Sequence, residues 1–72
     1  MFGSLSGKEL HYLAKVLADA SERVYYQALF AVECGAPEAD GLRATHTEIA
    51  YVHADVAGEL LDRARLTPAG AA

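Results

Sequence analysis

Apolar residues recur every three or four positions over two long stretches of the chain, and a single break divides them. The first stretch covers residues 7–34 and the second covers residues 37–65, so the two would extend about 42 Å and 44 Å as helices. This spacing gathers apolar residues on one side of each helix, as in amphipathic helices. Because only residues 35–36 form the turn, the two helices are predicted to be antiparallel neighbours.

The first helix has recognisable ends. Ser6 and Glu9 fit a capping box, in which each side chain accepts a hydrogen bond from the backbone N–H of the other residue. Gly35 suits the left-handed conformation that commonly follows the last helical residue. Residues 1–6 are therefore predicted to form an N-terminal segment and cap.

The start of the second helix has two interpretations. Pro37 fits the first position of a helix, where its missing N–H costs nothing. Alternatively, Asp40 caps a helix that starts at Gly41. We favour Pro37, because the second helix then matches the first in length. Arg63 and Arg65 suit the negative end of its dipole, and residues 66–72 are expected to form a disordered tail.

Each predicted helix carries one main apolar stripe. The stripe of the first helix consists of Leu10, Leu13, Leu17, Ala20, Val24, Ala28 and Ala31. The stripe of the second helix consists of Leu42, His46, Ile49, His53, Val56 and Leu60, with Thr45 and Val52 alongside.

Two helices cannot enclose a core by themselves, and a chain of 72 residues is close to the lower size limit for a stable single domain. We therefore expect another copy to cover the stripes. The predicted fold is all-α, an antiparallel helical hairpin that assembles into a homodimeric four-helix bundle. The residues expected at the oligomer interface are Leu10, Leu13, Leu17, Val24, Leu42, Ile49, Val52, Val56 and Leu60.

The second half of the first helix is apolar nearly all round, which indicates that it is covered on more than one side. Tyr12, Tyr26 and Phe30 lie roughly opposite the apolar stripe. Exposed aromatic residues suit a surface that binds a protein partner, but a wider homo-oligomer would bury them equally well. The predicted partner-binding residues are Tyr12, Tyr26, Leu29 and Phe30.

Two histidines provide the unusual chemistry of the second stripe. Imidazole is a common metal ligand, so His46 and His53 could hold a metal or haem in the bundle. They are about 10.5 Å apart along the helix, however, and neither has another ligand three or four residues away. Any such site would need ligands from another helix or subunit, and we favour the interpretation that both histidines pack in the seam.

Composition and charge exclude several classes of protein. The formal charge is −4, and the bases are scattered among acids, which disfavours a nucleic-acid binder. No apolar run approaches the roughly 20 residues of a membrane span, and residues 1–7 do not resemble a secretory signal. The single cysteine fits a reducing compartment. We therefore expect a cytoplasmic protein with no membrane association.

The sequence does not predict an enzyme. No serine has a nearby histidine, and there is no glycine-rich phosphate loop. Cys34 ends a helix beside Glu33, which disfavours a reactive thiolate, so it is expected to be a packing residue. We expect a small homo-oligomeric interaction module, a regulator or adaptor that binds a protein partner and needs no cofactor. The alternative is a metal- or haem-binding bundle that uses His46 and His53.

Overall fold

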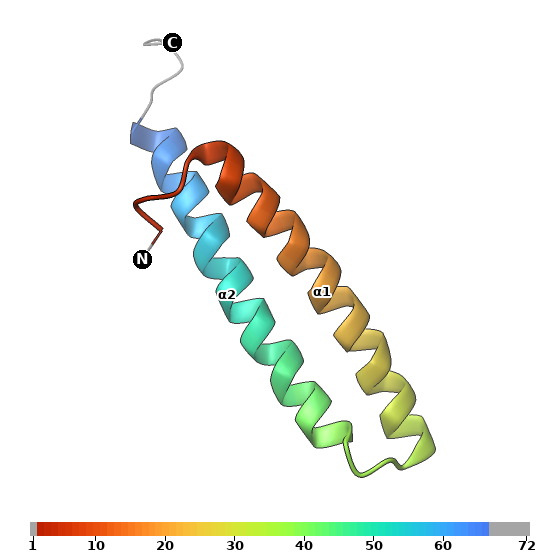
Figure 1. Ribbon diagram of the computed structural model, residues 1–72. Coiled ribbons are helices and arrows are strands. Elements are labelled where there is room, and N and C mark those ends of the chain that lie inside the picture. The colour runs from red at the N-terminus through yellow and green to blue at the C-terminus, as the bar shows by residue number, and fades with distance from the viewer. Residues whose placement is uncertain (1, 67–72) are drawn as a thin grey trace.

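The computed structural model describes residues 2–66. These residues form two α-helices, α1 (Gly7–Cys34) and α2 (Ala39–Leu66). The helices run antiparallel and pack against each other (Figure 1). The predicted all-α helical hairpin is therefore confirmed.

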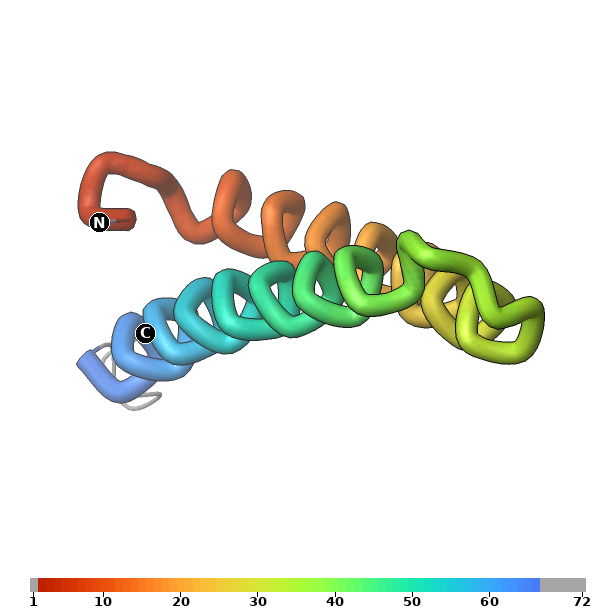
Figure 2. Tube along the Cα trace, turned by 90° about the horizontal axis from the view of Figure 1, so that it is seen from below, coloured from red at the N-terminus to blue at the C-terminus, as the bar shows by residue number. Residues whose placement is uncertain are grey.

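The molecule is a rod made of one helix pair. It measures 55 × 19 × 16 Å, with a radius of gyration of 16.0 Å, whereas a compact 72-residue domain has a radius of about 11 Å. Figure 2 shows that the two helix axes cross rather than lie parallel. Because residues 2–66 form one helix pair, most of their side chains away from the contact between the helices face outward.

The ends of α1 follow from local sequence. The Glu9 backbone N–H donates to Ser6 Oγ at 3.1 Å, and the Ser6 N–H donates to Glu9 Oε1 at 2.8 Å, so the predicted capping box is present. At the other end Gly35 has φ 66° and ψ 28°. The N–H groups of Gly35 and Ala36 donate to the carbonyls of Val32 and Ala31, which satisfies two carbonyls at the end of the helix.

The connection between the helices is longer than predicted. Pro37 does not begin α2; instead, the Ala39 N–H donates to the Ala36 carbonyl at 3.2 Å and closes a turn around Pro37 and Glu38. The first backbone hydrogen bond of α2 runs from the Leu42 N–H to the Glu38 carbonyl. The fixed φ of proline suits the second position of a turn as well as the start of a helix. This ambiguity explains the difference of two residues.

The far end of α2 reaches Leu66, so this residue is helical rather than part of the expected tail. The rest of that tail, residues 67–72, lies outside the described residues. Arg63 Nη2 donates to the Phe2 carbonyl at 2.9 Å, and Arg63 Nε donates to Glu59 Oε1 at 3.1 Å. Arg63 thereby joins the N-terminal segment to the last turns of α2.

The predicted stripes form the seam between α1 and α2. Leu10 and Val56 are fully buried, and Ala28 and Ala31 are 6% and 4% exposed. The remaining stripe positions are only half-buried: Leu13, Leu17, Ala20, Val24, Leu42, His46, Ile49, His53 and Leu60. Because apolar burial provides the main stabilisation, the few fully buried side chains of the seam supply only a small part of what the apolar residues of the hairpin could contribute.

Candidate functional site

One side of the hairpin is almost free of charge. The residues that directly follow the seam positions lie on the same side of both helices, since they share grooves that cross from α1 to α2. We call this side the alanine flank. From α1 it takes Ala14, Ala18, Ser21, Tyr25, Leu29 and Val32, and from α2 it takes Arg43, Thr47, Ala50, Ala54, Ala57 and Leu61.

Two grooves run along the alanine flank. The groove nearer the connection has a volume of about 440 Å³ and is lined by Tyr25, Ala28, Leu29, Val32, Arg43, His46 and Thr47. The groove nearer the middle has a volume of about 390 Å³ and is lined by Ala18, Ser21, Glu22, Tyr25, Tyr26, His46, Ala50 and His53. Tyr25 and His46 belong to both, so they form the ridge that separates the two grooves.

The rings of Tyr25 and His46 are packed together, with centroids 5.4 Å apart and planes tilted by 49°. This contact places Tyr25 of α1 level with His46 of α2. Both predicted histidines are half-buried in the seam and border the alanine flank. Of the two, His46 has an aromatic ring against it in the seam, that of Tyr25.

The described residues do not bring a metal-binding group of side chains together around the histidines. Within residues 2–66, no group of three or more His, Cys, Asp or Glu side chains is placed to hold a metal ion. The side-chain hydrogen bonds of the same residues include none from Ser21 to His46 or His53. No polar or charged residue in this part of the chain is buried. A metal at His46 or His53 would need ligands from a second molecule.

The opposite side of the hairpin is strongly polar. We call it the charged flank, because it contains the residues that directly precede seam positions. Its middle part takes Val16, Asp19, Arg23 and Gln27 from α1, and Glu48, Val52, Asp55 and Glu59 from α2. By the same rule, Tyr12 and Phe30 lie towards the two ends of its α1 row. Glu59 pairs with Arg63 and Asp19 pairs with Lys15 at 3.8 Å. The predicted interface residue Val52 therefore lies among acids.

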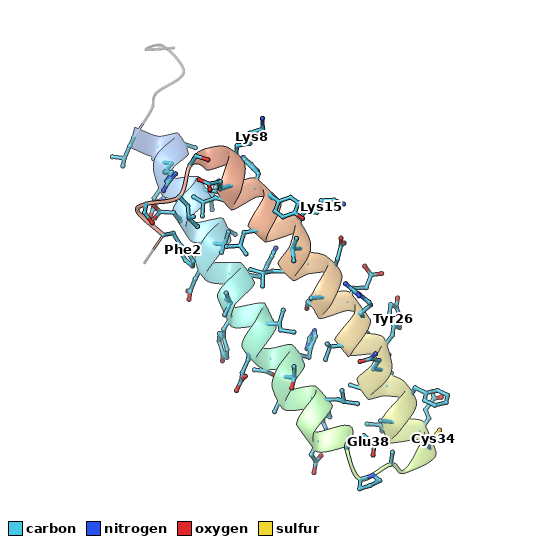
Figure 3. The ribbon with its side chains drawn as sticks, in the orientation of Figure 1. Phe2, Lys8, Lys15, Tyr26, Cys34 and Glu38 are labelled. Atoms are coloured by element: carbon cyan, nitrogen blue, oxygen red, sulfur yellow. The ribbon has the colours of Figure 1, made fainter. Side chains whose placement is uncertain are left out.

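The four predicted partner-binding residues are all exposed, but they do not form one surface. Leu29 lies on the alanine flank. Tyr26 and Phe30 are 60% and 69% exposed and line a third groove, although Tyr26 also borders the middle groove of the alanine flank. Tyr26 points away from α2 (Figure 3). Tyr12 is 71% exposed and lies about 21 Å from Tyr26 along the helix. Tyr12, Tyr26 and Phe30 remain as the aromatic outer face of α1.

The predicted oligomer interface residues differ in burial: some are covered within the seam, and others keep exposed surface. Leu10 and Val56 have no exposed surface in the single chain, so they stabilise the hairpin itself and cannot contact another copy. Val52 is 42% exposed. The other predicted interface residues are half-buried: Leu13, Leu17, Val24, Leu42, Ile49 and Leu60.

Cys34, expected to be a small packing residue, is not covered in the hairpin. Its side chain is exposed and lines a groove of about 470 Å³ with Gln27, Phe30, Ala31 and Leu42. As the last residue of α1, Cys34 lies where the hairpin ends and no helix remains to cover it. Figure 3 shows its position at the end of α1, close to Glu38.

Several exposed apolar residues were not predicted as functional. Tyr51 and Leu61 of α2 are 70% and 59% exposed. The alanine flank was also missed, although its signal is in the sequence. The residue after each stripe position of α2 is uncharged from Thr47 to Leu61, while the residue before the stripe position is often acidic.

Neither helix in residues 2–66 combines the length and the apolarity that a bilayer-crossing segment requires. Comparisons of the chain with models of known protein families, with curated proteins and with solved structures gave no match. A functional conclusion therefore depends on the surfaces of the hairpin alone.

Proposed function

We propose that the protein is a small non-enzymatic interaction module, a homo-oligomer of helical hairpins that acts as a regulator or adaptor by binding a protein partner. Two hairpins would pack as a four-helix bundle. Its two activities, pairing with itself and binding a partner, would use different surfaces of the hairpin.

The contrast between buried and exposed apolar side chains carries this proposal. In residues 2–66, four hydrophobic residues are buried, whereas eleven large hydrophobic side chains are between 42% and 82% exposed. Fully burying one such side chain contributes about 1.5–3 kcal/mol. A second hairpin that covers several of them would therefore add to the stabilisation that the seam provides.

Self-association is tested by the concentration dependence of thermal unfolding, followed by circular dichroism. Mass action stabilises an oligomer as the protein concentration rises, so Tm should increase across a hundredfold range of concentration. A cooperative transition at the same Tm throughout that range would overturn the proposal.

The aromatic outer face of α1 is the proposed partner surface. Tyr12, Tyr26 and Phe30 are all at least 60% exposed, and Tyr and Phe provide large contact areas at protein interfaces. The partner we expect is a protein that presents apolar pockets, because the side chains that protrude here are aromatic rather than charged.

This surface is tested by immobilising the parent and a Tyr26→Ser/Phe30→Ser variant as parallel baits, with Tyr51→Ser on α2 as the control. A protein that binds the parent and the control but not the double variant, and that binds again when purified, supports the surface. Equal binding to all three baits contradicts it.

A second candidate function is the binding of a metal or haem through His46 and His53, and it is favoured by their position along one groove. It requires ligands from another copy. Zinc or haem should then bind stoichiometrically, and His46→Ala and His53→Ala should each abolish the binding. If a chelator leaves both helicity and mass unchanged and neither ligand binds, this candidate is eliminated.

A further inference from the structure

We propose that a second copy of this chain docks on the alanine flank, and that the two hairpins lie antiparallel about a two-fold axis near Ser21 and Ala50. The connection of each copy then lies beside the start of α1 in the other. This inference rests on the proposed homo-oligomer and adds which face is used and in which orientation. The second copy is argued from charge, from the pattern of side-chain sizes and from the surface that the hairpin leaves open.

Charge separates the two flanks. Arg43 carries the one formal charge in the two rows of the alanine flank, and Glu22 also lines its middle groove. The charged flank contains five charged residues: Asp19, Arg23, Glu48, Asp55 and Glu59. The centres of protein interfaces are depleted of charged residues. With a formal charge of −4 per chain, contact through the alanine flank also leaves the acidic groups of both copies in solvent, where they repel each other least.

The sizes of the side chains change along the flank. Near the connection the flank carries Tyr25, Leu29 and Val32, which are 45%, 44% and 53% exposed. Towards the chain termini it carries Ala14 and Ala18 on α1. On α2 the same half of the flank carries Ala54 and Ala57. One half of the flank is therefore bulky, and the other half is small apart from Leu61 near its end.

Two copies of the alanine flank can face each other in two simple orientations, and their large and small side chains fit together in only one of them. A two-fold axis across the middle of the rod places the bulky half of each copy over the small half of the other. Small residues let helices approach closely, so the bulky side chains can be accommodated. A two-fold axis along the rod would instead stack Tyr25, Leu29 and Val32 on their own copies and leave a gap between the alanines.

Leu61 gives this orientation a specific contact. It is 59% exposed and lies at the small end of the flank, fifteen residues beyond His46, which is about 22 Å along the helix. The antiparallel arrangement brings Leu61 of one copy to the groove of about 440 Å³ beside Leu29 and Val32 of the other. Each copy fills a groove of its partner, as a closed two-fold interface requires.

The first experiment compares two substitutions on neighbouring turns of α2. Ala50→Glu adds a charge on the alanine flank, and Val52→Glu adds the same charge on the charged flank. Both positions are exposed in the single hairpin, so neither change places a charge in the seam. By sedimentation equilibrium, Ala50→Glu should raise the dimer dissociation constant at least about tenfold, and Val52→Glu should change it less than about threefold.

The second experiment measures the orientation in the parent protein, so that it does not depend on a variant that folds. Cys34 is exposed and is the single cysteine, and it lies outside the alanine flank. A nitroxide attached to it allows the distance between two copies to be measured by pulsed electron spin resonance. In the antiparallel dimer the labels on the two Cys34 residues are expected about 40 Å apart. In a dimer with its two-fold axis along the rod they are expected about 20 Å apart.

The outcomes separate this inference from the proposed function. A mass equal to one chain at every concentration would overturn the homo-oligomer. A dimer with the short Cys34 separation would overturn the orientation alone. A dimer weakened more by Val52→Glu than by Ala50→Glu would overturn the assignment of the face. The long separation together with the selective effect of Ala50→Glu would support the inference in full.

Discussion

An apolar stripe residue can hold the two helices together or contact another copy, and Leu10 shows the difference between these two roles most clearly. The sequence pattern assigns it to an oligomer interface, but the chain itself covers it completely. Burial of this kind cannot be predicted from periodicity, because a stripe position that the rest of the chain covers completely looks the same in sequence as one that it covers in part. The half-buried Leu17 and Leu13 retain surface for a second copy.

The burial of Leu10 makes its truncation costly. Leu10→Ala should lower the free energy of unfolding by about 2–5 kcal/mol, because the removed methyl groups leave a cavity in the seam. Leu66→Ala is the matched control, since Leu66 is 82% exposed, and it should change stability by less than about 0.5 kcal/mol. Urea denaturation of the three proteins at one concentration measures both values, and equal losses would contradict the seam.

Glu9 gives the protein a defined response to acid. The Ser6 backbone N–H, and next the Ser6 hydroxyl, stabilise the carboxylate and lower the pKa of Glu9 below its ordinary value of 4.5. A carboxylate with a lowered pKa contributes stability that is complete above the unfolded pKa and is lost as pH falls through the folded value. The helix cap is therefore expected to weaken below about pH 4.5 rather than near neutrality.

Glu9→Gln tests this response, because glutamine keeps an oxygen that can accept from the Ser6 N–H but removes the charge. The parent should be more stable than the variant at pH 7, and the difference should shrink as the pH falls to 3. Denaturant unfolding at both pH values measures it. A difference that stays constant or grows in acid would show that the charge of Glu9 does not stabilise the cap.

At the scale of the helices, the ends with a single interpretation were predictable and the ambiguous one was not. Ser6, Glu9 and Gly35 form hydrogen-bonded motifs that depend on a few adjacent residues, so the sequence predicts them directly. Pro37 is compatible with both a helix start and a turn, and the turn is formed because the Ala36 carbonyl accepts from the Ala39 N–H. Local preference could not choose between them.

Replacing a glycine with alanine should have opposite effects on the stability of the protein at two positions. Gly35 has φ 66°, a conformation that costs an L-residue about 1–2 kcal/mol, so Gly35→Ala should destabilise the hairpin by about that amount. Gly58 lies inside α2, and an added Cβ would meet no atom within 4 Å. Gly58→Ala should therefore stabilise the protein by up to about 1 kcal/mol. Thermal denaturation measures the stability change of each variant. Changes of the same sign in both variants would contradict the connection described between the helices.

At the scale of the whole molecule, the sequence predicted that the hairpin leaves apolar surface open, but not how that surface is divided. The prediction followed the stripes and the aromatic residues, which are large and easily noticed. The division depends on the smaller residues beside the stripes, such as Ala50 and Ala54, and on the acids across the seam from them, such as Glu59. Only the packing of α1 on α2 brings these rows together into one charge-poor face and one acidic face.

The most direct test of the account is the mass of the untagged protein in solution, measured by light scattering from low to high micromolar concentration. The exposed apolar side chains predict a mass of twice the 7.6 kDa chain, or an even multiple of it, at the upper concentrations. A protein that unfolds cooperatively yet scatters as a single 7.6 kDa chain over the whole range would contradict the central claim.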